Sequence, residues 1–125
     1  MALRKREDFL PLAVPSISEK EIAAVAEVLR SGWLTMGQRC LEFEKLMADY
    51  TGMPYAVSLN SCTAGLHLAL KAAGIGEGDE VIAPSLTFAA TVNVIVHVGA
   101  TPVLVDIEDR SYNIDPEKIK EKITP

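Results

Sequence analysis

The sequence contains little cysteine and little basic charge. Its two cysteines, Cys40 and Cys62, follow neither CxxC nor Cys/His ligand spacing, so neither a disulfide framework nor a zinc site is indicated. The net charge is −5, and the one basic cluster is Arg4-Lys5-Arg6 at the N-terminus. Duplex nucleic acid is not expected as the main partner, because binding its phosphates needs a concentrated positive face. No metal site is expected either.

A run without charge extends from Val81 to Val105, but it lacks the pattern of a membrane helix. Pro84, Gly99 and Pro102 interrupt it, and polar residues occur within it. The N-terminal residues also lack the apolar stretch and the cleavage site of a secretory signal. The run is therefore interpreted as a strand, a helix and a strand of a buried core, and a cytoplasmic protein is expected.

The length of 125 residues and the apolar fraction of 49% predict one ordinary domain around one core. Pro11 and Pro15 predict an extended arm over the first 17 residues. After the arm, helical and strand-like patterns alternate. The expected elements are a helix from the Ser18-Glu21 capping box to Gly32, a helix over 38–50 that ends at Gly52, a strand over 55–59, a helix over 63–73, a strand over 80–83, a helix over 87–98, a strand over 103–106 and a short helix that begins at Asp115-Pro116.

This order, two helices followed by βαβαβ, predicts an α/β fold with a mainly parallel sheet. An open sheet of three parallel strands normally continues, whereas this chain stops right after a helix. We therefore expect the front part of a larger α/β protein.

The turn Asn60 to Gly65 joins a predicted strand to the start of a predicted helix. Its small side chains, its hydroxyl groups and the positive end of the helix dipole are typical of a phosphate cradle. A tight βα turn capped by Ser61 or Thr63 explains the same residues, and from the turn alone both interpretations stay open. The later glycine-rich segment, 74–79, follows a helix and precedes a strand, so it is expected to be a connection and not a dinucleotide loop.

Three further features could serve a ligand. Phe88 follows the second predicted strand and could offer its ring to a planar cofactor, or it could be a core residue. Trp33 lies between two glycines, in a loop that could be a substrate lid or a packing loop that buries the indole. Cys62 is not expected to act as a nucleophile, and Asp106 and Asp109 are expected to be turn and cap residues.

Four motifs in order resemble the N-terminal part of the DegT/StrS family of pyridoxal-phosphate (PLP)-dependent nucleotide-sugar aminotransferases. They are SGWLTMG (31–37), SCTAGLH (61–67), PSLTFAAT (84–91) and GATPVLVD (99–106), and the resemblance extends from Phe9 to Pro125. It implies a partial aminotransferase type I fold. Residues 1–125 would form the N-terminal arm, the helices and the first part of the PLP-binding large domain, without the rest of that domain or a C-terminal small domain.

The resemblance also implies PLP as cofactor, glutamate and a nucleotide-linked keto sugar as substrates, a homodimer, and a role in cell-envelope or polysaccharide biosynthesis. Residue by residue, Thr63, Ala64 and Gly65 match the turn that binds the cofactor phosphate, and Phe88 matches the aromatic residue that stacks on the pyridine ring. In the first motif, Trp33 and Thr35 are candidate substrate contacts.

The chain departs from the family pattern at Gln38 and Cys62, where many members have proline and glycine. In the family, the lysine that forms the Schiff base lies beyond the point where this chain ends, and none of its lysines falls in the matching motif. We therefore expect no catalytic residue in the chain, which by itself would be inactive. The alternatives are a truncated, non-catalytic phosphate-binding or interaction module and a PLP-dependent sugar dehydratase of the same family.

Overall fold

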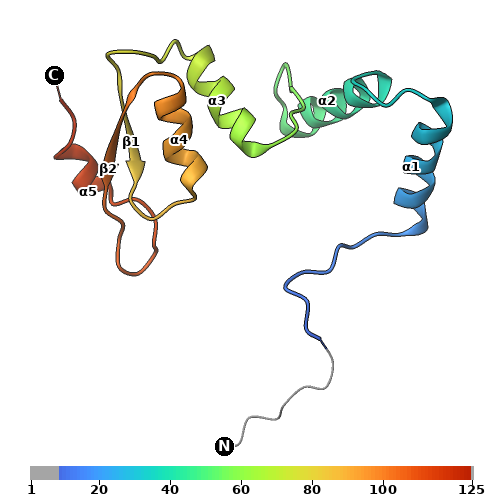
Figure 1. The fold of residues 1–125 in the computed structure, drawn as a ribbon, viewed down its shortest axis with the longest axis horizontal. Coiled ribbons are helices and arrows are strands. Elements are labelled where there is room, and N and C mark those ends of the chain that lie inside the picture. Colours follow the sequence, from blue (N-terminus) through green and yellow to red (C-terminus); the bar gives the residue numbers. More distant parts are fainter. Residues whose placement is uncertain (1–8, 125) are drawn as a thin grey trace, which may run out of the picture. The chain divides into compact units, whose positions relative to one another are not determined.

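The computed structural model describes residues 9–124, and the chain divides between Ala56 and Val57 into two compact units. Figure 1 shows the elements along the chain. The basic cluster Arg4-Lys5-Arg6 lies outside the described residues. The first unit contains α1 (Glu19–Ser31) and α2 (Gln38–Thr51); the second contains α3 (Cys62–Ala72), β1 (Glu80–Pro84), α4 (Ala89–His97), β2 (Thr101–Val105) and α5 (Pro116–Lys120).

The two helices of the first unit begin and end within one residue of the predicted bounds. Ser18 caps α1 in a capping box with Glu21, whose pKa is lowered chiefly by the hydrogen bond from the Ser18 hydroxyl. Gly32 follows α1 with φ 71° and Gly52 follows α2 with φ 68°, a left-handed conformation that glycine adopts without a steric penalty. Local sequence signals therefore determine both helices.

The core lies in the second unit, around a parallel pair of strands. β1 pairs with β2 in a register from Glu80–Thr101 to Pro84–Val105, and α4 is the helix of the crossover between them. The buried residues are all aliphatic, and none of the described residues is a buried polar residue. The central cluster consists of Ala83, Ile95, Val98 and Ala100, with Leu70, Ile75, Val81 and Val92 packed against it.

The structure corrects two predictions. The strand predicted over 55–59 is absent, because a strand needs a hydrogen-bonded neighbour and the described sheet consists of β1 and β2 alone. The prediction of one domain also differs from the structure, which divides into two compact units. The helices α1 and α2 of the first unit contain no buried residue.

Other boundaries shift by a few residues. The helix predicted from 87 starts at Ala89, because the Ser85 N–H still bonds the Val105 carbonyl at 2.8 Å and the chain turns only after it. The predicted α5 cap is confirmed: the Asp115 side chain accepts from the Glu117 N–H, and Pro116 occupies the first turn.

Among residues 9–124, no helix is long and apolar enough to cross a membrane.

Candidate functional site

The N-terminal turn of α3 is both a capped turn and an open anion site. The Ser61 hydroxyl accepts a hydrogen bond from the Ala64 N–H at 3.1 Å, and the Gly65 N–H donates to the Ser61 carbonyl at 3.2 Å. The N–H groups of Cys62 and Thr63, at the first two helical positions, have no carbonyl partner within the helix. Because Ser61 is the cap, the exposed Thr63 hydroxyl is not used for capping. This arrangement fits a phosphate group.

Phe88 lies at the N-cap of α4 and is 80% exposed. The alternative of a core phenylalanine is therefore wrong within the described structure. A phenyl ring cannot accept the hydrogen bond that an N-cap side chain normally accepts, and α4 has no side-chain cap bond. A large exposed ring at a position that favours small polar residues contributes little to folding, so the site suits contact with a flat ligand.

The Thr63 turn and Phe88 lie at the same end of the second unit. Helix α3 packs against α4, and both helices run opposite in direction to β1 (Figure 1). Their first turns consequently lie toward the carboxyl end of β1, where open α/β sheets bind ligands.

Asp106 lies at the same end of the sheet, directly after β2. Its Oδ1 accepts from the Ile107 N–H at 2.9 Å and from the Ser85 hydroxyl at 3.3 Å, and its Oδ2 pairs with Lys118 Nζ at 3.2 Å. The hydrogen bond from the Ile107 N–H, and after it the contact with Lys118, lower the pKa of the Asp106 carboxyl. The hydrogen bond between Lys118 and Asp106 also raises the pKa of the Lys118 amine. The turn role predicted for Asp106 is confirmed, whereas its ties to Ser85 and Lys118 were not predicted.

One signal in the sequence points to this contact. Ser85 and Asp106 lie within two residues of the ends of the predicted strands and directly follow the observed β1 and β2, and neighbouring parallel strands place such residues side by side. The lysine gives no such signal, because its approach depends on where α5 lies.

The first unit contains a cavity of about 570 Å³ around the Trp33 loop. The Trp33 indole is 63% exposed, so the loop does not bury it in a core. Its Nε1 donates to the Met36 carbonyl at 3.0 Å, and its ring lies against Gly37, where a Cβ would come within 2.3 Å of Nε1. The residues lining the cavity are Glu27, Val28, Ser31, Trp33, Leu34, Thr35, Gly37, Gln38, Arg39 and Cys40.

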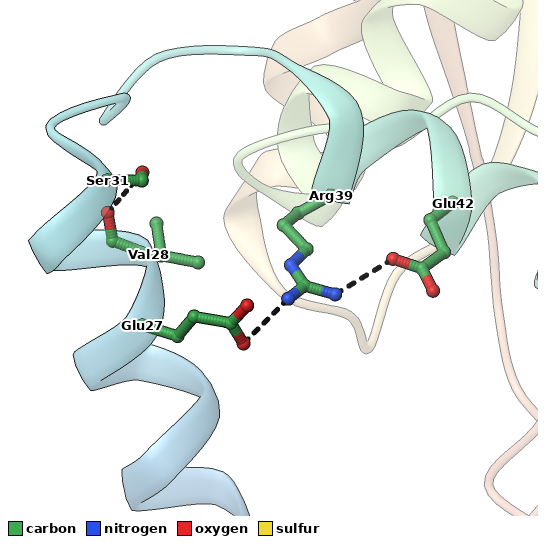
Figure 2. A network of polar contacts seen from close by, with 5 residues as sticks. All are labelled: Glu27, Val28, Ser31, Arg39 and Glu42. Atoms are coloured by element: carbon green, nitrogen blue, oxygen red, sulfur yellow. Dashed lines mark hydrogen bonds and ion pairs between the residues drawn. The ribbon is translucent and has the colours of Figure 1, made fainter.

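Two ion pairs lie beside this cavity. Figure 2 shows Arg39 of α2 between Glu27 of α1 and Glu42 of α2, at 2.8 and 3.1 Å. All three side chains are more than half exposed, so these pairs add little stability. They place the Arg39 guanidinium at the wall of the cavity between two carboxylates, with Trp33 and Thr35 among the other lining residues.

The remaining candidates have structural roles. Gly74 and Gly78 have positive φ, and the Gly76 N–H donates to Asp79 Oδ2 at 2.8 Å, which confirms segment 74–79 as a connection. Both cysteines are free. Across residues 9–124, no group of three His, Cys, Asp or Glu side chains could hold a metal ion.

Comparison with known proteins gives a consistent set of matches. Residues 15–125 match the DegT/DnrJ/EryC1/StrS aminotransferase family model. The spore coat polysaccharide biosynthesis protein SpsC of Bacillus subtilis is 52% identical over 123 residues, which cover 98% of this chain and 32% of SpsC. The chain thus spans about a third of the length of this relative.

Solved structures match equally well. The PLP form of Streptococcus pneumoniae Spr1654, a protein assigned as a sugar aminotransferase, has a TM-score of 0.86 at 45% identity and matches over 92% of this chain and 29% of its own. The Escherichia coli GDP-4-keto-6-deoxy-D-mannose-3-dehydratase with bound hydrated PLP has a TM-score of 0.84 at 31% identity, over 91% of this chain and 31% of its own. These matches confirm the predicted α/β fold as part of an aminotransferase type I fold.

Proposed function

The chain belongs to the DegT/DnrJ/EryC1/StrS aminotransferase family, and from this we propose that it forms the cofactor-phosphate and ring-stacking part of a PLP-dependent enzyme. The reaction we propose is transfer of an amino group from glutamate to a nucleotide-linked keto sugar, by a homodimer active in polysaccharide biosynthesis. Residues 1–125 would be the N-terminal arm, the helices and the first part of the large domain. The observation that carries this proposal is the open first turn of α3 at the same end of the sheet as the exposed Phe88 ring.

The residues of the chain divide the binding task between them. Thr63, Ala64 and Gly65 would form the turn that binds the phosphate, helped by the dipole of α3. The Thr63 hydroxyl and the N–H groups of Cys62 and Thr63 would contact it, since the N–H groups of Ala64 and Gly65 bond Ser61. The Phe88 ring would cover one face of the pyridine ring and exclude water from it. When bound, PLP supplies the electron sink for amino-group transfer.

The substrate side of the proposal concerns the cavity in the first unit. Trp33 and Thr35 line it together with apolar side chains such as Val28 and Leu34. The charge of Arg39 in the wall is balanced by Glu27 and Glu42. Such a lining suits a ligand with a flat apolar part, such as the base of a nucleotide-linked sugar.

A PLP titration of the purified protein, as its gene encodes it, tests the cofactor part. Thr63→Val removes the hydroxyl and keeps the shape, so we expect PLP affinity to fall by roughly tenfold, the value of one hydrogen bond to a charged group. Thr63→Ser keeps the hydroxyl and should retain wild-type affinity. Thr51→Val, in α2, is the matched control, since Thr51 bonds only backbone carbonyls of its own helix. Equal affinities for all four proteins would contradict the proposal.

Product analysis tests the reaction. With glutamate and a nucleotide-linked keto sugar, we expect 2-oxoglutarate and an amino sugar, detected by mass spectrometry. The similarity to the E. coli dehydratase makes dehydration the second candidate function. A sugar product that has lost water, with no amino group gained, would establish it. Since we propose no catalytic lysine within residues 1–125, steady transamination by this chain alone, dependent on Lys71, would refute that assignment.

A further inference from the structure

Asp106 joins three segments of the second unit that are separate in sequence. Its side chain receives hydrogen bonds from Ser85 in the turn between β1 and α4, from its own neighbour Ile107, and from Lys118 of α5. Its carbonyl accepts from the Asp115 N–H at 3.1 Å, directly before α5. One residue thus connects the ends of both strands with the helix that follows them.

The tie to Ser85 continues the strand register by one residue. Pro84 pairs with Val105, so Ser85 and Asp106 are the next pair along the parallel strands. The Ser85 N–H bonds the Val105 carbonyl at 2.8 Å, and the Ser85 hydroxyl reaches Asp106. The main chain and the side chain of Ser85 are therefore both held to β2.

The turn held in this way is the one that carries Phe88. Its far end is fixed as well, because the Thr91 N–H donates to the Phe88 carbonyl at 2.9 Å and the hydroxyls of Thr87 and Thr91 lie 2.9 Å apart. The ring itself is 80% exposed, so packing contributes little to its orientation. Its position therefore depends on the two ends of the turn.

We propose that Asp106 is a positioning residue: through Ser85 it holds the β1–α4 turn so that Phe88 faces the cofactor ring. This inference rests on the proposed function. It assigns no contact between Asp106 and the cofactor, and it leaves the phosphate cradle on α3 independent of the turn.

The test uses the protein as its gene encodes it and two independent measurements. The first is amide hydrogen exchange at residue 85, measured by NMR without cofactor, which reports on how firmly the Ser85–Asp106 hydrogen bond holds residue 85. The second is the pair of dissociation constants for PLP and for inorganic phosphate. Ser85→Ala removes the hydroxyl from an exposed residue and keeps the main-chain bond, so we expect a folded protein.

For Ser85→Ala we expect exchange at residue 85 to accelerate by about fivefold, and the PLP dissociation constant to rise by a similar factor, the value of one ordinary hydrogen bond. Asp106→Ala should act in the same direction. Ser85→Thr, which keeps a hydroxyl, should restore both values. The dissociation constant for inorganic phosphate should stay unchanged, since the phosphate binds at α3. Asp49→Ala breaks a comparable exposed pair with Lys45 in α2 and should change nothing.

Unchanged amide hydrogen exchange at residue 85 in Ser85→Ala would show that the Ser85–Asp106 hydrogen bond does not hold the turn. Faster exchange with unchanged PLP affinity, or with phosphate affinity lowered as much as PLP affinity, would overturn the positioning role. A wild-type protein that binds neither PLP nor phosphate would refute the proposed function and with it the positioning role. The exchange data would still show whether the Ser85–Asp106 hydrogen bond holds the turn.

Discussion

Replacing Gly37 by alanine should displace the indole ring of Trp33. A Cβ built at residue 37 lies 2.3 Å from Trp33 Nε1 and 2.6 Å from Cδ1, whereas ordinary contacts begin near 3.4 Å. The ring must therefore retreat by about 1 Å, and the 3.0 Å hydrogen bond from Nε1 to the Met36 carbonyl is strained or lost. The backbone is not the obstacle, because φ of Gly37 is −170°, an extended value that alanine also adopts.

The cost of this displacement is small and has two parts. Loss of an exposed hydrogen bond costs about 1 kcal/mol, and alanine is a poorer N-cap than glycine, which adds a few tenths of a kcal/mol or more for α2. Gly37→Ser separates the parts: serine has the same Cβ and meets the same ring, but it supplies a good cap. We expect both variants to move the ring, and only Gly37→Ala to weaken α2.

Tryptophan fluorescence measures the effect directly, since Trp33 is the one tryptophan in the chain. Both variants should show emission shifted to longer wavelength and faster quenching by acrylamide. Circular dichroism should show lower thermal stability for Gly37→Ala than for Gly37→Ser, because only serine supplies a good cap. Gly76→Ala is the control, because its Cβ would meet the nearest atom, the Val98 carbonyl oxygen, at an ordinary 3.7 Å. Emission and quenching that stay at wild-type values in Gly37→Ala and Gly37→Ser would refute the described contact.

Three further outcomes follow from the second unit. Ile95→Ala should lower the free energy of unfolding by about 2–5 kcal/mol in a urea titration, because Ile95 is 2% exposed in the core. Gly65→Ala should raise it by about 0.5–1 kcal/mol, because the new methyl meets Leu59 Cδ1 at an ordinary 3.5 Å within a helix. The Asp106–Lys118 pair should stabilise α5 at neutral pH. Because the carboxyl pKa is lowered, this contribution is lost as pH falls below about 4, and because the amine pKa is raised, it is lost as pH rises above about 10. NMR shifts of both side chains would show the two transitions.

The helices were predictable wherever local chemistry determines them. The Ser18 capping box, the glycines after α1 and α2, and the Asp115-Pro116 start of α5 all act within a few residues of chain. The prediction of a strand over 55–59 was wrong because a strand depends on more than local chemistry. Its alternating residues are suited to a strand, but a strand also needs a neighbour, and local pattern contains no information about that neighbour.

In the candidate site, too, local features were easier to predict than contacts between distant segments. A side-chain cap at the start of α3 was predicted from residue type, but the choice between Ser61 and Thr63 was left open, and so was the choice between an exposed and a core position for Phe88. The contact between Asp106 and Lys118 was not predicted, because it depends on how the chain turns between β2 and α5. The exposure of Trp33 also escaped prediction, since its hydrogen bond and its contact with Gly37 are specific to the loop conformation.

The crossover from β1 through α4 to β2 has a consequence for how the protein folds. Most core contacts join residues between Glu80 and Val105, with Leu70 and Ile75 close before them. Contacts between residues near in sequence cost little loop-closure entropy and form quickly. A ribosome adds roughly 5–20 residues per second, far more slowly than such a unit closes. The core should therefore assemble during synthesis, soon after Val105 leaves the exit tunnel.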